Sequence, residues 1–289
     1  MPTNTISPFK KYVPLLDEAY KLASLTSILD GPDDMVREGA NAGELVVPDM
    51  VLQGLVGYSR ANGFTDGTVT MANTTYQCNY ERGRMFTVDA MDNIETAGVA
   101  FGRLAGEFIR MHVAPEIDAF RLAKYAGVSG VGSASGDLAT GADVVAALRA
   151  AINAMDNGEV PMNERYLFIV PTLYGLLEDL DTTKSRAVLS RFDNVIQVPQ
   201  SRMYSAVSLS TSGSGGYSRT TAGKNMNFIA VHKSAVLQYN KHVVPKVVTP
   251  EQNQTADAWK FGYRVCGIAD VFKNKKAGVY AHIVSNNPA

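Results

Sequence analysis

The sequence is poor in the residues that mark disulfide-bonded, metal-binding and redox proteins. Its 289 residues include only two cysteines, Cys78 and Cys266, too few for a disulfide framework, and we interpret them as two buried thiols in a reducing compartment. The four histidines form no HExxH motif and are not spaced with the cysteines as zinc ligands are. The sequence therefore predicts neither a metal site nor a cofactor.

An excess of one charge and long apolar runs are also missing. Lysine and arginine total 27 against 28 acidic residues, a net charge of −1, which excludes a chain that binds nucleic acid through its overall charge. No stretch approaches 18 apolar residues, and no apolar run of signal-peptide type is present at the N-terminus. We expect a soluble protein made in the cytoplasm, with no membrane partner.

Local catalytic motifs are absent as well. There is no GxSxG elbow. The Gly/Ser-rich segments at 127–141 and 208–223 lack the spacing of phosphate-binding loops and are interpreted as linkers. Asp89, Asp92 and Glu95 cluster near a helix start, where helix capping explains them better than paired catalytic carboxylates. The prediction is that the chain is not an enzyme and has no catalytic residue.

A long helix dominates what is present. Asp92 is suited to cap a helix that runs to Ala114, with Glu95 in the capping-box position. An apolar stripe along it ends at His112, which we interpret as a satisfied core residue. Pro115 is expected to kink or restart the helix, with Glu116 and Asp118 suited to the new first turn.

Three glycines interrupt this helix at four-residue spacing, at Gly98, Gly102 and Gly106. Each costs about 1 kcal/mol relative to alanine in a helix interior, and together they lie along one narrow groove. Either another backbone lies close against this groove, or the glycines are tolerated in a helix held by packing elsewhere.

The segment from Glu44 to Thr87 has a different character. Short β-type runs alternate with turn signals, and apolar residues are too sparse for a core. We expect a long two-stranded ribbon whose partner is another subunit, or else a hairpin that folds back on its own domain. Arg82 and Arg84, at the base of this ribbon, are candidates for intersubunit ion pairs or for a solvated edge.

The remainder mixes helices and strands, which indicates an α+β fold. Periodicity predicts a helix over 142–156 and a shorter one over 172–180. Strands are predicted over 166–170 and 195–198. The C-terminal part is expected to close with a hairpin of 259–271 and 278–284.

Two stretches carry a resemblance to a known family. They are RGRMFTVDAMDNIETAGVAFGRLAGEFIRMHVAPEIDAFRLAKYA (82–126) and WKFGYRVCGIADVFKNKKAGVYAHI (259–283). In this order they resemble the loop return, the spine helix and the closing strands of tailed-bacteriophage major capsid proteins, which have the Johnson fold shared with encapsulin shells. The resemblance covers nearly the whole chain and rests on the pattern and order of the parts.

The resemblance implies a domain division. An N-terminal arm would take 1–42 and an extended β-hairpin loop 43–90. A peripheral domain with the spine helix would take 91–130 and 240–289, and an axial domain 131–239. Candidate intersubunit contacts are then the six residues already singled out: Arg82, Arg84, Glu95, Gly98, Gly102 and Gly106.

The implied function is that of a structural subunit. It would assemble with itself into hexamers and pentamers of an icosahedral head, in the host bacterial cytoplasm, and remain in the virion. A separate scaffolding protein, a portal and packaged double-stranded DNA, held without sequence-specific contacts, would be its partners. The second interpretation is an encapsulin-type nanocompartment shell, and the third is a soluble α+β enzyme.

Two departures from the family pattern carry information. Some family members crosslink through a lysine of the extended loop, but no lysine occurs between Lys21 and Lys124, so we predict no isopeptide bond through this loop. Some members begin with a long cleaved scaffolding domain, whereas this sequence begins with methionine and a short polar arm, which favours a separate scaffold.

Overall fold

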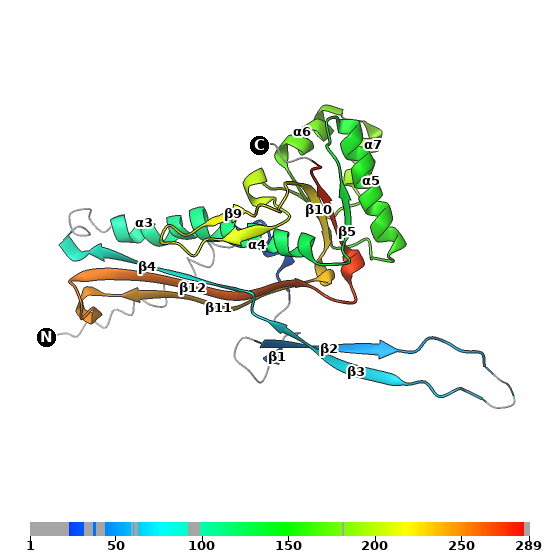
Figure 1. Ribbon diagram of the computed structural model, residues 1–289, viewed down its shortest axis with the longest axis horizontal. Helices are drawn as coiled ribbons and strands as arrows, with labels where there is room; N and C mark the ends of the chain where they lie inside the picture. Colours follow the sequence, from blue (N-terminus) through cyan, green and yellow to red (C-terminus); the bar gives the residue numbers. More distant parts are fainter. Residues whose placement is uncertain are drawn as a thin grey trace, which may run out of the picture.

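The computed structural model describes residues 23–31, 37–38, 44–58, 60, 63–91, 99–180 and 182–285. They form three parts that Figure 1 separates clearly: a long sheet with a helix lying along it, a lobe of sheet and helices at one end, and a thin ribbon that projects away. The expected α+β class is confirmed.

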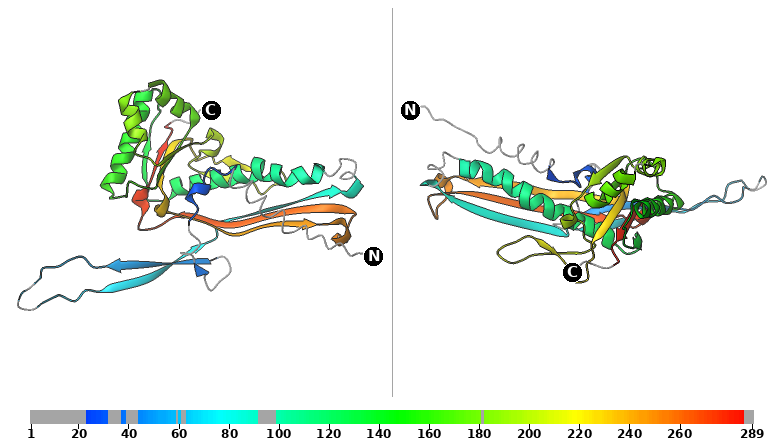
Figure 2. Two further views of the ribbon diagram at one scale, coloured as in Figure 1. Left: turned by 180° about the vertical axis from the view of Figure 1, so that it is seen from behind. Right: turned by 90° about the horizontal axis from the view of Figure 1, so that it is seen from above.

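The projecting ribbon is built from β2 (Glu44–Leu52) and β3 (Val69–Gln77), paired antiparallel along their whole length. The two-residue strand β1 (Arg37–Glu38) adds to β2 near the base. The left view in Figure 2 shows the ribbon apart from the other elements, and the right view shows its outer end extending beyond the lobe. The predicted two-stranded excursion is thus present, and among the described residues it does not fold back on its own domain.

The long sheet has the order β11-β12-β4. Its strands are β4 (Tyr80–Asp89), β11 (Val236–Val248) and β12 (Ala258–Val271), all antiparallel. The run 85–88, which the sequence placed in the extended ribbon, therefore lies in β4 and pairs with β12. The ribbon ends at Gln77, and the chain enters the long sheet at Tyr80.

The long helix lies along the sheet as α3 (Val99–Phe108), a π-helical turn (Ile109–Val113) and α4 (Ala114–Gly127). Pro115 has no N–H to donate to the preceding turn. In the π-helical turn Ala114 N–H bonds to Ile109 O. This wider turn accommodates the missing bond, so that the helix continues beyond Pro115. The expected helix start at Asp92 lies outside the described residues.

The extra residue of the π-helical turn rotates the helix surface, and it corrects the prediction for His112. The apolar stripe continues through the buried residues Ile109, Val113 and Ile117, whereas His112 is exposed. A helical wheel with 3.6 residues per turn fails at such a turn, so the interpretation of His112 as a core residue is wrong.

The lobe is organised around a five-stranded sheet of order β5-β13-β10-β6-β7. Its strands are β5 (Gly132–Ser135), β6 (Arg165–Ile169), β7 (Asn194–Gln197), β10 (Met226–His232) and β13 (Val279–Ile283). The helices α5 (Gly141–Asn157), α6 (Pro171–Leu180) and α7 (Thr183–Leu189) pack on one face. A capping box between Thr140 and Asp143 starts α5.

The predicted C-terminal hairpin is wrong. β12 lies in the long sheet, while β13 crosses into the lobe and pairs with β10 and β5. β13 is held there because both faces of the lobe sheet are covered: Tyr280 joins the helices, and Val279 and Ala281 join the main core with α4. Strands buried on both faces read as continuous apolar runs, as VYAHI does.

A second, smaller ribbon joins β8 (Val207–Leu209) to β9 (Tyr217–Arg219). It lies beside the long helix in Figure 1. Its connecting loop, 210–216, was predicted to be a plain linker, but it reaches the base of β4.

Candidate functional site

The ribbon is attached to the rest of the molecule at a short break between β3 and β4. Tyr76 is buried there, 8% exposed, in a small cluster with Leu237 and Ile268. The Asn79 side chain bonds to both backbone groups of Ala269: its Nδ2 donates to the carbonyl at 2.7 Å, and its Oδ1 accepts from the N–H at 3.1 Å. The root of the ribbon is therefore fixed.

Beyond this root the ribbon has almost no internal support. Every described side chain from Leu52 to Asn73 is exposed except Gly63. Tyr58 and Phe64 pair edge-to-face near the tip, with ring centroids 5.1 Å apart, yet Phe64 is 90% and Leu55 fully exposed. Large apolar side chains gathered on an otherwise uncovered ribbon indicate an interaction surface.

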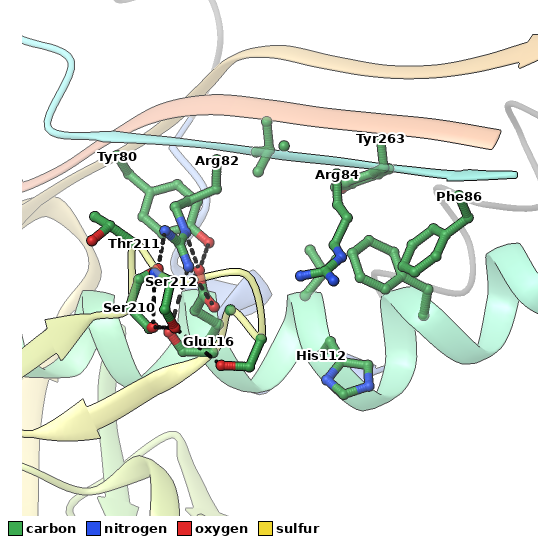
Figure 3. A pocket seen from close by; sticks show the side chains of 17 residues that line it. Tyr80, Arg82, Arg84, Phe86, His112, Glu116, Ser210, Thr211, Ser212 and Tyr263 are labelled. Carbon is green, nitrogen blue, oxygen red and sulfur yellow. Dashed lines mark hydrogen bonds and ion pairs between the residues drawn. The ribbon is translucent and has the colours of Figure 1, made fainter. Parts of the chain in front are cut away.

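Arg82 connects three elements just above the root. Its Nε donates to Glu116 Oε1 at 2.8 Å, at the start of α4, and its Nη1 donates to the Ser210 carbonyl at 2.7 Å. The Tyr80 hydroxyl donates to the same Glu116 oxygen at 3.0 Å. Figure 3 shows this group gathered beside the 210–216 loop.

The electrostatics of this junction are those of a structural contact. Burial, and then the neighbouring Glu116 carboxylate, raise the pKa of Tyr80 well above its usual range. Tyr80 therefore remains a neutral hydrogen-bond donor and is not available as a base. We call the hydrogen-bonded group of Tyr80, Arg82, Glu116 and the Ser210 carbonyl a joint, because it holds β4, α4 and the 210–216 loop in one arrangement.

A buried polar anchor ties the segment 23–31 to α4. Asp118 is completely buried and accepts four hydrogen bonds from residues 24–26, together with an ion pair to Arg202 at 3.1 Å. The two hydroxyl donors, Ser24 Oγ and Thr26 Oγ1, donate to Asp118 Oδ1 at 2.7 and 2.6 Å, and the backbone N–H groups of Leu25 and Thr26 donate to Oδ2 and Oδ1 at 2.9 and 3.2 Å.

A second layer of contacts surrounds this anchor. Arg121 donates to Thr26 Oγ1 at 3.1 Å and to Asn240 Oδ1 at 3.0 Å. Gln238 donates to the Thr26 carbonyl at 2.7 Å and accepts from the Tyr125 hydroxyl at 2.7 Å. These side chains lie on α4 and β11, so the anchor joins the segment to the helix and the long sheet together.

The sequence did not identify this anchor. Asp118 was noted only as an acidic residue suited to the first turn of a helix. Its partners lie more than 80 residues away in the chain, and no local pattern connects them.

The structure brings some of the six candidate contact residues together and leaves others untested. Arg82 and Arg84 line the same cavity, but Arg82 is engaged within the subunit. Gly106 has open space where a side chain would stand, and Gly102 lies within α3. Glu95 and Gly98 lie outside the described residues. The intersubunit roles of all six stay predictions.

The described residues contain neither a candidate metal site nor a candidate membrane-spanning helix. Within the described ranges, no group of three or more His, Cys, Asp or Glu side chains is arranged to hold a metal ion. No helix in that part of the chain is long and apolar enough to cross a membrane.

No protein-family model matches the sequence, and no curated protein matches it either. Solved structures do match. A structure from Gordonia phage Cozz has a TM-score of 0.62 at 12% identity, covering 91% of this chain and 87% of that one. The capsid structure of cyanophage P-SCSP1u has a TM-score of 0.60 at 15% identity, covering 92% and 89%.

The virus-like particle from Pyrococcus furiosus is similar to the same extent, with a TM-score of 0.61 at 11% identity and coverage of 96% and 100%. The class that these structures and the geometry define is the phage capsid fold, and the resemblance seen in the sequence is confirmed at the level of the fold. Identities this low establish the fold and leave function to the site.

Proposed function

We propose that this chain is the major capsid protein of a tailed double-stranded DNA bacteriophage or prophage, a structural subunit of its icosahedral head. The observation that carries the proposal is the ribbon of β2 and β3. It is fixed at its root by Tyr76 and Asn79 and presents uncovered apolar side chains along its length. A ribbon without a core of its own becomes stable by lying on another subunit.

The phage capsid fold supports this assignment, since the similar structures include phage capsids and a virus-like particle. In the shell, copies of the chain would form hexamers and pentamers. A separate scaffolding protein and a portal would assist assembly in the host cytoplasm. The finished virion would enclose DNA that the near-neutral chain contacts without sequence preference.

The domain division goes with this proposal. An arm over 1–42, an extended loop over 43–90, a peripheral domain over 91–130 and 240–289, and an axial domain over 131–239 remain our proposed units. The strand pairings refine them: β4 belongs with the long sheet, and β13 with the lobe.

The proposal assigns no catalysis to the chain. The similar structures are capsids and particles, in which the subunit has a structural role. The buried carboxylates Glu116 and Asp118 are occupied by donors from the same chain, as expected for joints that hold a shape.

One alternative has a specific observation in its favour. Because the virus-like particle from Pyrococcus furiosus is as similar as the phage structures, an encapsulin-type shell that encloses protein is the second candidate. The two differ in contents, and the subunit fold does not distinguish them.

The contents of the native particles therefore distinguish the two candidate functions. Native assembled particles are isolated by sedimentation, and their absorbance at 260 and 280 nm is compared. Large uniform particles rich in nucleic acid are expected. Particles of the same size that carry a protein would instead establish the encapsulin alternative, and a chain that stays monomeric with scaffold and partners supplied would refute both.

A further inference from the structure

A cavity of about 340 Å³ lies between β4, the π-helical turn and the loop that joins β8 to β9. Figure 3 shows Arg84 reaching from β4 toward the helix, with the Arg82–Glu116 group on one side and Phe86 on the other. The walls come from three separate parts of the fold, and the joint made by Arg82 fixes their spacing.

The charges around the cavity do not cancel. Arg82 and Glu116 neutralise each other, and the remaining lone pairs of Glu116 Oε1 are used by the Tyr80 hydroxyl. Arg84 makes a cation–π contact with Phe86, at 5.7 Å from the ring centroid. Among the described residues, no carboxylate or carbonyl accepts a hydrogen bond from its guanidinium.

The other walls of the cavity contribute side chains that can donate hydrogen bonds. His112 lines the cavity from the π-helical turn, and Ser212 and Ser214 line it from the loop. The loop backbone is held close, because a Cβ on Gly215 would lie 3.2 Å from Arg84 Nη1. Gly215 and Gly216 both have positive φ, at 69° and 85°, a conformation that suits glycine.

We propose that this cavity binds an oxyanion, a carboxylate or phosphate group, with Arg84 as its principal ligand. A guanidinium presents a planar fork of donors that matches two oxygens of such a group. The serine hydroxyls and the His112 imidazole supply further donors at the edges. The residual positive charge of the walls selects an anion.

The oxyanion has two possible sources. It can be a free anion from solution, or the carboxylate of an aspartate or glutamate on a second copy of this chain. The first source is independent of shell assembly, whereas the second requires that copies associate. Two arms of one experiment separate them.

The first arm measures the binding of inorganic phosphate to dispersed subunits by titration calorimetry at constant ionic strength. The wild-type chain is compared with Arg84→Gln and with the control Arg110→Gln, an exposed arginine of the π-helical turn that pairs with Glu107 outside the cavity. Arg84 is exposed, so its replacement leaves no buried charge. Phosphate binding that weakens about tenfold or more in Arg84→Gln alone establishes the free-anion source.

The second arm measures association between copies by sedimentation velocity. If a partner carboxylate fills the cavity, Arg84→Gln raises the subunit concentration needed for association about tenfold. Added phosphate then competes with association in the wild type, and Arg110→Gln behaves as the wild type. No phosphate binding together with no Arg84-dependent association would overturn the proposal, whether or not the chain forms shells.

Discussion

The strands β10 and β3 are similar in length but differ in how far their side chains are covered by the rest of the chain. All seven residues of β10 are buried, because helices cover one face of its sheet and the main core covers the other. In β3, among nine residues, Tyr76 at the root is buried and Thr74 partly so. β10 pairs with β13 and β6 on its two sides, whereas β3 pairs with β2 at the edge of its described sheet, and of the two strands β10 alone has both faces covered.

The difference separates stability from assembly. Burying a leucine or phenylalanine side chain contributes about 1.5–3 kcal/mol. In the lobe this contribution is already made within the chain, whereas at Leu55 and Phe64 it is available only when something covers the ribbon. The buried side chains of the lobe therefore stabilise the folded chain. The exposed side chains of the ribbon would contribute their free energy of burial only on association with another molecule.

The largest expected effect is in the lobe. Phe228→Ala in β10 removes a ring that is completely buried between α5 and the sheet. Loss of burial and the resulting cavity should lower the free energy of unfolding by about 3–5 kcal/mol, measured by urea denaturation of dispersed subunits. The matched variant Phe64→Ala in the ribbon should leave it nearly unchanged, and equal losses would abolish the distinction between the two regions.

The buried anchor should rank next. Asp118→Asn leaves one acceptor oxygen where two carboxylate oxygens now receive donors, and its new NH₂ group faces donors from residues 24–26. Breaking such a buried network by removing one charge should cost about 3 kcal/mol. Urea denaturation measures the loss, and limited proteolysis should cut near residues 23–31 faster.

The control for the anchor is Asp66→Asn, which changes an exposed carboxylate in the ribbon. It should alter neither unfolding nor proteolysis of the dispersed subunit. An Asp118→Asn variant as stable as this control would mean that the segment 23–31 contributes nothing to the fold.

A smaller effect should appear as pH dependence confined to the lobe. Burial lowers the pKa of His282 below its usual value of 6.5, and its Nδ1 lies 3.0 Å from Asn227 Nδ2, as an unprotonated acceptor would. The unfolded chain then binds more protons than the folded one as pH falls through 6.5. Stability should therefore decrease from pH 7 to pH 5.5.

Replacing His282 by Asn places an amide oxygen near the acceptor position but removes the titration. The decrease in stability over this pH range should become smaller, though not vanish, because burial also lowers the pKa of His232. Urea denaturation at several pH values measures the slope. A His282→Asn variant that keeps the wild-type slope would contradict the assignment of the pH dependence to His282.

The features that sequence reasoning located are those with a local cause. The helix predicted over 142–156 is α5, Gly141–Asn157, since its apolar period, its cap at Thr140 and Gly158 beyond its end are all local. The ribbon was found because turn residues and sparse apolar side chains both indicate strands without a core. That its partner is another subunit was inferred from the same sparsity and stays a prediction.

The features that it missed depend on distant partners or on helix irregularity. β13 follows β12 closely in sequence, so a hairpin was expected. β13 instead pairs with β10 in the lobe sheet, where its side chains are buried on both faces. Asp118 was taken for a helix-start residue because its donors lie more than 80 residues away in the chain. The cavity around Arg84 likewise joins β4, the helix and a distant loop.

The smallest effect on stability, and the largest on assembly, should come from the ribbon itself. The double change Leu55→Ser with Phe64→Ser removes two of its most exposed apolar side chains. Because neither is covered within the subunit, the free energy of unfolding should change by no more than about 0.5 kcal/mol. Sedimentation of assembly reactions should nevertheless show fewer particles, since the surface that would be covered on association has become polar.

The matched control is Met162→Ser, an exposed apolar side chain of the lobe, 50% exposed. It should change neither unfolding nor assembly, which tests whether exposure alone or exposure on the ribbon matters. A stability loss of about 1 kcal/mol or more in the double variant would mean that the ribbon supports its own subunit. Unaltered assembly would mean that the shell contacts lie elsewhere, and either result would remove the distinction between the ribbon and β10.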